Sequence, residues 1–350
     1  MRIAKMIERR APRRSNEGRK MVLSVEFEEP ITADELAFVT QDPLVDPGVI
    51  SEAVGKLLLA GRVGLKLREL AVGMKQGRIS AVVFKGCHEV PDQTGPTPFG
   101  MRPQASDTAW RLHALVTLGL MYCLDLQPVS YDRENGGDMF VHLVVDTLGQ
   151  GRAASGSRDE MGGHTDLLSF EFAHEFGDCS RTPPAPDFVI LTGIRNPGLT
   201  ATYIAPLEDL AEVLSSASVD ELMRPQFNLA RQPSIDEDYD CLSSDRPVIS
   251  LDPDWGRVIR YSASKVSADP DSAPATEALE DLASVVPKVR EEVVVEPGDV
   301  FFLNNRLNLH GREKIDVGTT SKDRWLLRSY ANRTSTPARY VAGSKHKIQC

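Results

Sequence analysis

The sequence predicts a mainly β fold, a sandwich or jelly roll, with helices packed around it. Short runs of β-branched and aromatic residues, many bounded by Gly, Pro, Asn or Asp, follow one another at irregular spacing after Leu126. They lie at residues 139–145, 188–191, 258–261, 292–295, 300–303 and 325–330. No regular strand–helix alternation is visible, and no glycine-rich phosphate loop follows a strand, which argues against a kinase or a nicotinamide enzyme.

The N-terminal part, residues 30–125, reads as mostly helical. Thr32 and Glu35 have the spacing of a capping box, and Asp46-Pro47 is typical of a helix start. Apolar residues then recur at helical spacing to about Lys75. A buried strand is expected at residues 80–85, and Ser106 could cap a further helix through residues 110–121.

Residues 21–345 are expected to form a single domain. Residues 1–20 carry eight Lys or Arg, which favours a solvated, disordered tail or an upstream start before Met21 over an anion-binding arm or a targeting signal. Residues 206–216 and 219–223 read as surface helices. Residues 231–290 are rich in Asp, Glu, Ser and Pro, and an irregular segment of that length predicts a lid-like insertion.

Composition excludes several classes of protein. The formal net charge of −10 argues against a nucleic-acid-binding surface. The five cysteines form no C-x-x-C pair, and no apolar run is long enough for a bilayer, so neither a disulfide framework nor a membrane span is indicated. We expect a cytoplasmic protein whose partner is a small molecule, and the sequence leaves its oligomeric state open.

Candidate metal ligands occur in two places. His164 and Asp166 are two residues apart and would share a face of a strand. Seven histidines and 50 acidic residues in 350 predict about one such pair by chance, so the pair alone is weak. His310 follows a Pro-Gly-Asp turn and an apolar strand. Two histidines and one carboxylate form the facial triad of non-haem iron(II) oxygenases, which leaves positions open for other ligands.

Two arginines follow, Arg324 and Arg328, four residues apart and so on one face of a regular strand. A fixed guanidinium fork suits the carboxylate of a 2-oxo acid.

These motifs together resemble the clavaminate-synthase-like branch of the taurine-dioxygenase superfamily, which includes hydroxylases of free amino acids. The resemblance covers roughly residues 125–332. It rests on Gly156-Ser157, His164-Thr165-Asp166, Pro186-Asp187-Phe188-Val189, Arg195, Thr202, Pro297-Gly298-Asp299, Asn305, His310-Gly311-Arg312 and Asp323-Arg324-Trp325-Leu326-Leu327-Arg328.

The resemblance implies a double-stranded β-helix of the cupin-like jelly-roll type that binds Fe(II), 2-oxoglutarate and O₂. His164, Asp166 and His310 are then the iron ligands. Arg324 and Thr202 bind the far carboxylate of 2-oxoglutarate, and Arg328 binds a carboxylate of the substrate, with a structural ion pair as its alternative. The implied activity is hydroxylation of an unactivated C–H bond at the β or γ carbon of a free or modified amino acid.

Three departures from the family pattern bear on the substrate. The ligand is Asp166 where many members have Glu, which alters any contact of its second oxygen with a substrate amine. An acidic residue here also argues against a halogenase. Where arginine-hydroxylating relatives place carboxylates, this chain has Ser262 and Ser264, which predicts a neutral side chain on the substrate. Asp252 or Asp254 could replace those carboxylates if the alignment slips.

Several alternatives stay open. The same cofactors could serve desaturation or oxidative cyclisation, and a cupin-like metal hydrolase or a binding protein is a less favoured class. His174 could be a fourth ligand, although a surface or core histidine is the simpler interpretation. Residues 135–138, Asn-Gly-Gly-Asp, could face the substrate or form an ordinary turn.

Overall fold

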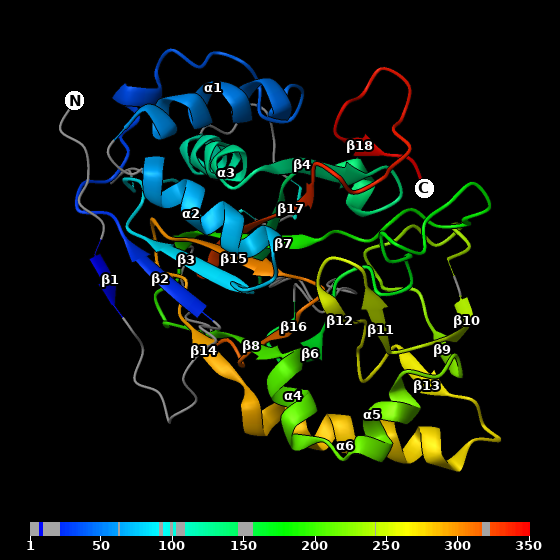
Figure 1. The fold of residues 1–350 in the computed structure, drawn as a ribbon. Coiled ribbons are helices and arrows are strands. Elements are labelled where there is room, and N and C mark those ends of the chain that lie inside the picture. Colours follow the sequence, from blue (N-terminus) through cyan, green and yellow to red (C-terminus); the bar gives the residue numbers. More distant parts are fainter. Residues whose placement is uncertain are drawn as a thin grey trace.

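The computed structural model describes residues 7–9, 22–61, 64–90, 94–98, 101–102, 109–145, 157–241, 243–316 and 323–350. These residues form four layers (Figure 1). Three N-terminal helices cover one face of a large sheet, a smaller sheet lies against its other face, and three further helices cover the smaller sheet.

The large sheet has nine strands. Its order is β1 (Ile7–Arg9), β2 (Val22–Glu26), β3 (Ala81–Lys85), β15 (Val300–Asn304), β7 (Phe188–Arg195), β17 (Trp325–Arg333), β4 (Leu126–Tyr131) and β18 (Lys347–Ile348), with β5 (Val141–Val144) paired to β17. Strands far apart in sequence are neighbours here, so the sheet ties the C-terminal motifs to the middle of the chain.

The smaller sheet has four strands in the order β14 (Glu291–Val293), β8 (Thr202–Pro206), β16 (Asn308–Arg312) and β6 (Met161–His164). Two minor sheets flank it. They comprise β10 (Ser243–Arg246), β9 (Phe227–Leu229) and β13 (Val266–Ala268), and then β11 (Ile249–Asp252) and β12 (Gly256–Ile259). The expected strands at 139–145, 188–191, 258–261, 292–295, 300–303 and 325–330 are confirmed, with bounds shifted by a few residues.

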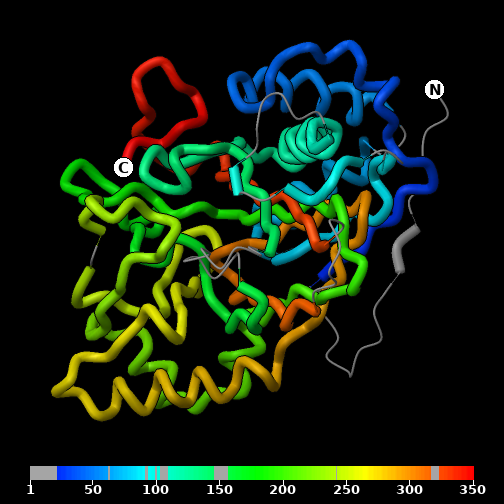
Figure 2. Tube along the Cα trace, turned by 180° about the vertical axis from the view of Figure 1, so that it is seen from behind, coloured from blue at the N-terminus to red at the C-terminus, as the bar shows by residue number. Residues whose placement is uncertain are grey.

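Three apolar clusters separate the layers. Helices α1 (Pro47–Ala60), α2 (Gly64–Lys75) and α3 (Arg111–Cys123) pack on the outer face of the large sheet. A second cluster fills the space between the sheets and includes Val189, Leu191, Ile204, Phe301 and Leu326. The third lies under α4 (Leu207–Val213), α5 (Ser216–Leu222) and α6 (Ala273–Val289). Seen from behind, α6 lies opposite the N-terminal helices and the C-terminal segment (Figure 2).

The helical N-terminal part agrees with the sequence. The Thr32 hydroxyl accepts from the N–H of Glu35, whose carboxylate accepts from the N–H of Thr32, as a capping box requires. It begins only the short helix η1 (Asp34–Leu36). Helix α1 starts at Pro47 as expected, whereas Ser106 lies outside the described residues. Of the expected basic tail, the structure describes only Ile7–Arg9, paired with β2.

The segment 231–290 is more ordered than its composition indicates. It contains β10 to β13 and the 17-residue helix α6, whose buried residues Ala275, Ala278, Leu282, Val285 and Val286 repeat at helical spacing. Short apolar side chains among many Ser, Asp and Glu hid this period in the sequence. The surface helices expected at 206–216 and 219–223 are confirmed as α4 and α5.

Some of the motif residues shape the fold. Gly298 has a φ of +89°, and the Asp299 carboxylate after it accepts from the Lys85 ammonium at 2.6 Å and the Gly86 N–H at 2.9 Å. A Cβ on Gly311 would lie 2.3 Å from the Tyr203 ring and 2.4 Å from the Met161 carbonyl oxygen. Glycine at 311 therefore lets β16 lie close to β6. No helix in the described ranges is both long enough and apolar enough to cross a bilayer.

Two buried histidines make the helix–sheet interface sensitive to acid. The rings of His88 and His113 meet edge-to-face with centroids 4.6 Å apart. Burial lowers the pKa of His88 to about 4, and burial together with His88 lowers the pKa of His113 well below its usual value. Neither Nδ1 nor Nε2 of His113 has a hydrogen-bond partner. Both rings are therefore neutral in the fold, whereas in the unfolded chain they take up protons near pH 6.5.

We predict that stability falls as pH drops below about 6.5, because the unfolded chain then binds protons that the fold excludes. His113→Phe should weaken this dependence by about 1 kcal/mol between pH 6.5 and 5.5. Urea unfolding at pH 6.5 and 5.5 measures this pH dependence. The control is His174→Gln, because His174 is not one of the buried histidines. Parallel stability losses in wild type and His113→Phe would contradict the assignment.

Candidate active site

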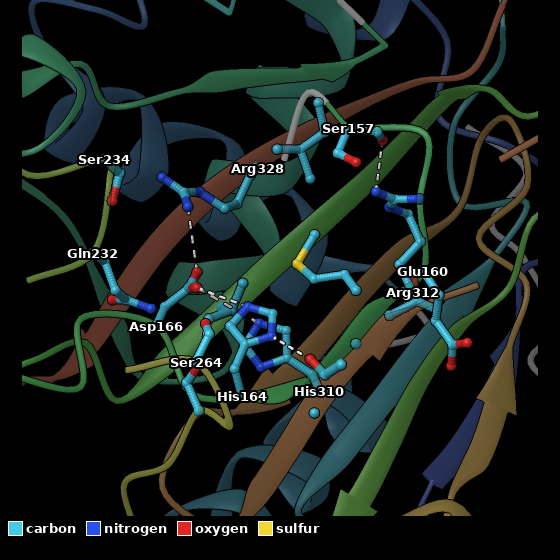
Figure 3. Close-up of a pocket in the computed structure, with 18 of the residues that line it drawn as sticks. Ser157, Glu160, His164, Asp166, Gln232, Ser234, Ser264, His310, Arg312 and Arg328 are labelled. Atoms are coloured by element: carbon cyan, nitrogen blue, oxygen red, sulfur yellow. Dashed lines mark hydrogen bonds and ion pairs between the residues drawn. The ribbon is translucent and has the colours of Figure 1, made fainter. Parts of the chain in front are cut away.

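A cavity of about 590 Å³ lies between the two sheets. Its wall combines residues from β5, β6, β7, β8, β16 and β17 with two stretches of the 231–290 segment. His164, Asp166 and His310 lie together in this cavity, and Figure 3 shows Arg328 above Asp166 and Arg312 farther to the right. The sequence motifs at either end of the chain thus meet in a single site.

The three expected ligands converge. Asp166 Oδ1 lies 3.4 Å from His164 Nε2 and 3.8 Å from His310 Nε2, and one ligand atom from each residue lies within 4.8 Å of the others. An ion bound at roughly 2 Å from each atom would hold neighbouring ligand atoms about 3 Å apart. The donor set therefore fits a divalent metal after small side-chain shifts, and among the described residues it is the one such cluster.

Strand pairing explains why the histidines meet. On β16, His310 is in register with His164 of β6 on one side and with Ile204 of β8 on the other. The ring centroids of the two histidines are 4.3 Å apart. His164 Nδ1 lies 3.0 Å from the Gly162 carbonyl oxygen, which could accept its N–H and so leave Nε2 free to bind a metal.

Asp166 does not continue the strand as the spacing argument assumed. Strand β6 ends at His164, and Asp166 begins a turn in which Leu167 has a φ of +53°. Asn305 holds this turn: its Oδ1 accepts from the Asp166 N–H at 2.9 Å, and its Nδ2 donates to the Asp166 carbonyl at 3.0 Å. The motif residue Asn305 therefore positions the carboxylate ligand.

The electrostatics keep the ligands in their metal-binding forms. Burial lowers the pKa of His310 to about 3, with a smaller contribution from His164, so the imidazole is neutral. Burial alone would raise the pKa of Asp166, but the hydrogen bond from His164 and the charge of Arg328 outweigh it and hold that pKa well below its usual value.

One end of the cavity holds a buried cation that has no carboxylate partner among the described residues. Arg324 is 5% exposed, its Nε has no hydrogen-bond partner, and burial with the neighbouring Arg312 lowers its pKa to about 9. Thr202 and Ser157 line the same cavity, and Arg312 donates to the Ser157 carbonyl at 2.8 Å. An anion at this end would compensate the guanidinium charge of Arg324.

Elsewhere in the cavity wall, Arg328 links two carboxylates. Its guanidinium lies 2.6 Å from Glu134 Oε1 and 3.3 Å from Asp166 Oδ2, and Tyr330 Oη donates to the same Asp166 oxygen at 3.0 Å. The expectation of a structural ion pair is thus partly correct. The Nε of Arg328 has no hydrogen-bond partner among the described residues, and the side chain lines the cavity wall.

A third part of the wall is polar and carries no carboxylate. It is formed by Gln232, Ser234, Ser262, Ser264 and Lys265, all from the 231–290 segment. The only acidic residues in the described cavity wall are Asp166 and Glu160, and Glu160 is ion-paired with Arg290 at 3.0 Å.

Several alternative assignments are wrong. His174 lies between Asp252, at 3.3 Å, and Ser250, at 3.2 Å, and is not part of the metal-ligand cluster. Asp252 and Asp254 do not line the cavity, because both pair with Arg333. Residues 135–138 form an ordinary turn outside the cavity wall. Gly156 lies outside the described residues.

Sequence reasoning missed Glu134, Tyr330 and Lys265. Tyr330 could have been found, since it is two residues beyond Arg328 and on the same face of β17. Glu134 carries no local signal, because it reaches Arg328 only through the pairing of distant strands. Lys265 lies one residue beyond the predicted Ser262 and Ser264, in a turn that composition alone does not reveal.

The fold and the site define the class: a β-sheet protein that presents two histidines and a carboxylate to one ion, with two arginines nearby. The chain belongs to the taurine catabolism dioxygenase TauD, TfdA family, whose profile matches residues 112–330. Membership places it among the iron- and 2-oxoglutarate-dependent dioxygenases.

Known proteins support this grouping. The chain is 23% identical to the L-lysine 4-hydroxylase of Flavobacterium johnsoniae over 281 residues, which covers 77% of this chain and 70% of the hydroxylase. It is 28% identical to the L-asparagine oxygenase of Streptomyces coelicolor over 174 residues, which covers 45% of this chain and 49% of the oxygenase. The non-heme iron oxygenase OrfP, solved with Fe, succinate and (3S)-hydroxy-L-Arg, shares the fold with a TM-score of 0.73 and 20% sequence identity. The alignment covers 90% of this chain and 94% of OrfP.

We predict that His310→Ala lowers Fe(II) affinity by more than about 100-fold. Mutating a residue that only hydrogen-bonds to a metal ligand lowers metal affinity by about 10- to 100-fold, and removing the ligand itself should cost more. Isothermal titration with Fe(II) under anaerobic conditions measures it, alongside circular dichroism to verify the fold. His174→Ala is the matched control and should bind Fe(II) as wild type does. Equal affinities in the two variants would refute the ligand assignment.

Proposed function

We propose that the protein hydroxylates an unactivated C–H bond, at the β or γ carbon, of a free or modified amino acid with a neutral side chain. His164, Asp166 and His310 would bind Fe(II), Arg324 and Thr202 would bind 2-oxoglutarate, and Arg328 would bind the substrate carboxylate. When bound, iron and 2-oxoglutarate supply the oxidising chemistry: O₂ converts 2-oxoglutarate to succinate and CO₂, and the substrate gains one oxygen atom.

The observation that carries this proposal is that two arginines, Arg324 and Arg328, line the same cavity as the triad. Among the described residues, neither Nε has a hydrogen-bond partner. A metal hydrolase or a binding protein with the same triad would have no use for two such cations. A dicarboxylate co-substrate and an amino-acid substrate would use one each.

The residues of the cavity would orient the co-substrate and the substrate in this reaction. Arg324 and Thr202 would orient the co-substrate by its far carboxylate, and Arg328, held by Glu134, would orient the substrate. Two stretches of the 231–290 segment border the cavity, Gln232–Ser234 and Ser262–Lys265. We propose that residues 231–290 form a lid and that these two stretches are the part of it that contacts the substrate.

The preference for a neutral side chain follows from the charges of the wall. A lysine or arginine side chain would face hydroxyl groups, an amide and the Lys265 ammonium, with no free carboxylate in the described wall. Each charge-assisted hydrogen bond lost would cost about 1.5–3 kcal/mol. Asparagine, glutamine, leucine or a cyclic relative fits this wall better, and the similarity to an asparagine oxygenase supports that choice.

The strand order is consistent with the further proposal of a double-stranded β-helix, since the four-stranded sheet β14-β8-β16-β6 faces the large sheet across the cavity. A reducing, cytoplasmic setting also stays a prediction, and the five free cysteines are in keeping with it.

The two arginines should separate in steady-state kinetics. Arg324→Ala removes a charge-assisted pair, so we predict a KM for 2-oxoglutarate about 10- to 100-fold higher, with little change in the KM for the amino acid. Arg328→Ala should raise chiefly the KM for the amino acid. It also leaves Glu134 buried without its cation, so thermal stability should fall as well.

The ratio of the two KM values in each variant is the diagnostic, because loss of stability alone changes both together. If Arg328→Ala affected only 2-oxoglutarate, the assigned roles of the arginines would be reversed.

The substrate class can be tested by competition. The twenty amino acids, each with Fe(II), ascorbate and 2-oxoglutarate, are assayed for succinate release and for a product heavier by one oxygen atom. We expect turnover with a neutral candidate and little with lysine or arginine. A product lighter by two hydrogens would indicate desaturation or cyclisation instead.

Ser264→Asp supplies the matched variant, because it adds the carboxylate that the wall lacks. It should improve turnover of lysine or arginine relative to the neutral substrate. Efficient conversion of arginine by the unaltered protein, with none of the neutral candidates, would overturn the substrate proposal and leave the oxygenase assignment standing.

A further inference from the structure

The two oxygens of Asp166 have different surroundings. Oδ1 faces the histidines, 3.4 Å from His164 Nε2 and 3.8 Å from His310 Nε2. Oδ2 points the other way, where it accepts from Tyr330 Oη at 3.0 Å and lies 3.3 Å from a guanidinium nitrogen of Arg328. Figure 3 shows Arg328 reaching this carboxylate from the side away from the histidines. Only one oxygen therefore faces the metal position.

Two ring contacts and a hydrogen bond fix the position of Tyr330. It is 4% exposed on β17, and the Arg328 guanidinium lies over its ring at 4.5 Å. Its ring also contacts that of Tyr131 edge-on, with centroids 6.1 Å apart. A phenol has one O–H, and Asp166 Oδ2 at 3.0 Å is a nearer acceptor than Glu134 Oε1 at 3.5 Å. The hydroxyl is thus aimed at the ligand carboxylate.

This division matters because an octahedral ion has few positions to spare. Three protein ligands leave three positions, of which the 1-carboxylate and 2-oxo group of 2-oxoglutarate take two and O₂ needs the third. A carboxylate can also bind a metal through both oxygens. If Asp166 did so, the position needed by O₂ would be filled.

We propose that Tyr330 is a positioning residue that keeps Asp166 bound through Oδ1 alone and so preserves the position for O₂. This inference rests on the proposed function, since it concerns the same metal site. Arg328 contributes to the same end, but it is also assigned to the substrate carboxylate. Tyr330 is one of the two groups on Oδ2 and has no other assigned role, so it isolates the effect.

The test is Tyr330→Phe, which removes one oxygen atom and keeps the ring. The matched control is Tyr131→Phe: Tyr131 is buried in the same cluster, but its hydroxyl donates to the Pro184 carbonyl at 2.8 Å and not to Asp166. Each protein is loaded anaerobically with Fe(II) and 2-oxoglutarate. Nitric oxide, which binds at the position that O₂ would take, is then titrated and followed by electron paramagnetic resonance.

We expect Tyr330→Phe to bind Fe(II) at least as tightly as wild type and nitric oxide about tenfold or more weakly, with the KM for O₂ raised by a similar factor. Tyr131→Phe should lose comparable thermal stability while its nitric oxide titration matches wild type. Equal nitric oxide binding by Tyr330→Phe and wild type would overturn the inference. A wild-type protein that binds neither Fe(II) nor 2-oxoglutarate would instead overturn the proposed function itself.

Discussion

The position of β16 between β6 and β8 is the constraint on which the site depends. Its register places His310 beside His164, and Gly311 permits the close approach because a side chain there would overlap Tyr203 and the Met161 carbonyl. Asp166 completes the cluster from a turn that Asn305 fixes by two hydrogen bonds. The ligands are thus preorganised by backbone pairing, and any metal that binds need not order them at the cost of conformational entropy.

The two arginines near this cluster differ in whether carboxylates of the protein neutralise their charge. Arg328 is compensated within the protein by Glu134 and Asp166, and these carboxylates raise its pKa above the usual value despite burial. Arg324 has no such compensation from the described residues, and burial lowers its pKa. A buried, uncompensated cation is unfavourable, so binding of an anion there would remove a cost as well as add hydrogen bonds. This asymmetry supports Arg324 as the residue for the co-substrate.

The polar wall contributed by the 231–290 segment is where this chain departs from the charge pattern expected of enzymes for basic amino acids. The similarity to lysine hydroxylases extends over most of the chain, but overall similarity reflects the sheets and helices that carry the site. Under the proposed function, selectivity among amino acids would depend on a few side chains such as Ser262, Ser264 and Lys265, because an unpaired charge in a buried pocket is costly.

The sequence by itself determined the mainly β fold and the helical N-terminal part, because each leaves a local signal. The three candidate metal ligands and the two arginines were found from motifs that carry weight only in combination. A proline at a helix start, strand alternation and short motifs are all readable within about ten residues. Tertiary structure decided what depends on distant partners. The hidden helix α6, the Glu134–Arg328 pair and the shared carboxylate of Asp166 arise from residues far apart in the chain. Their contacts exist only once β17, β4 and the smaller sheet have been brought together, since strand order across a sheet is set by packing and not by local sequence.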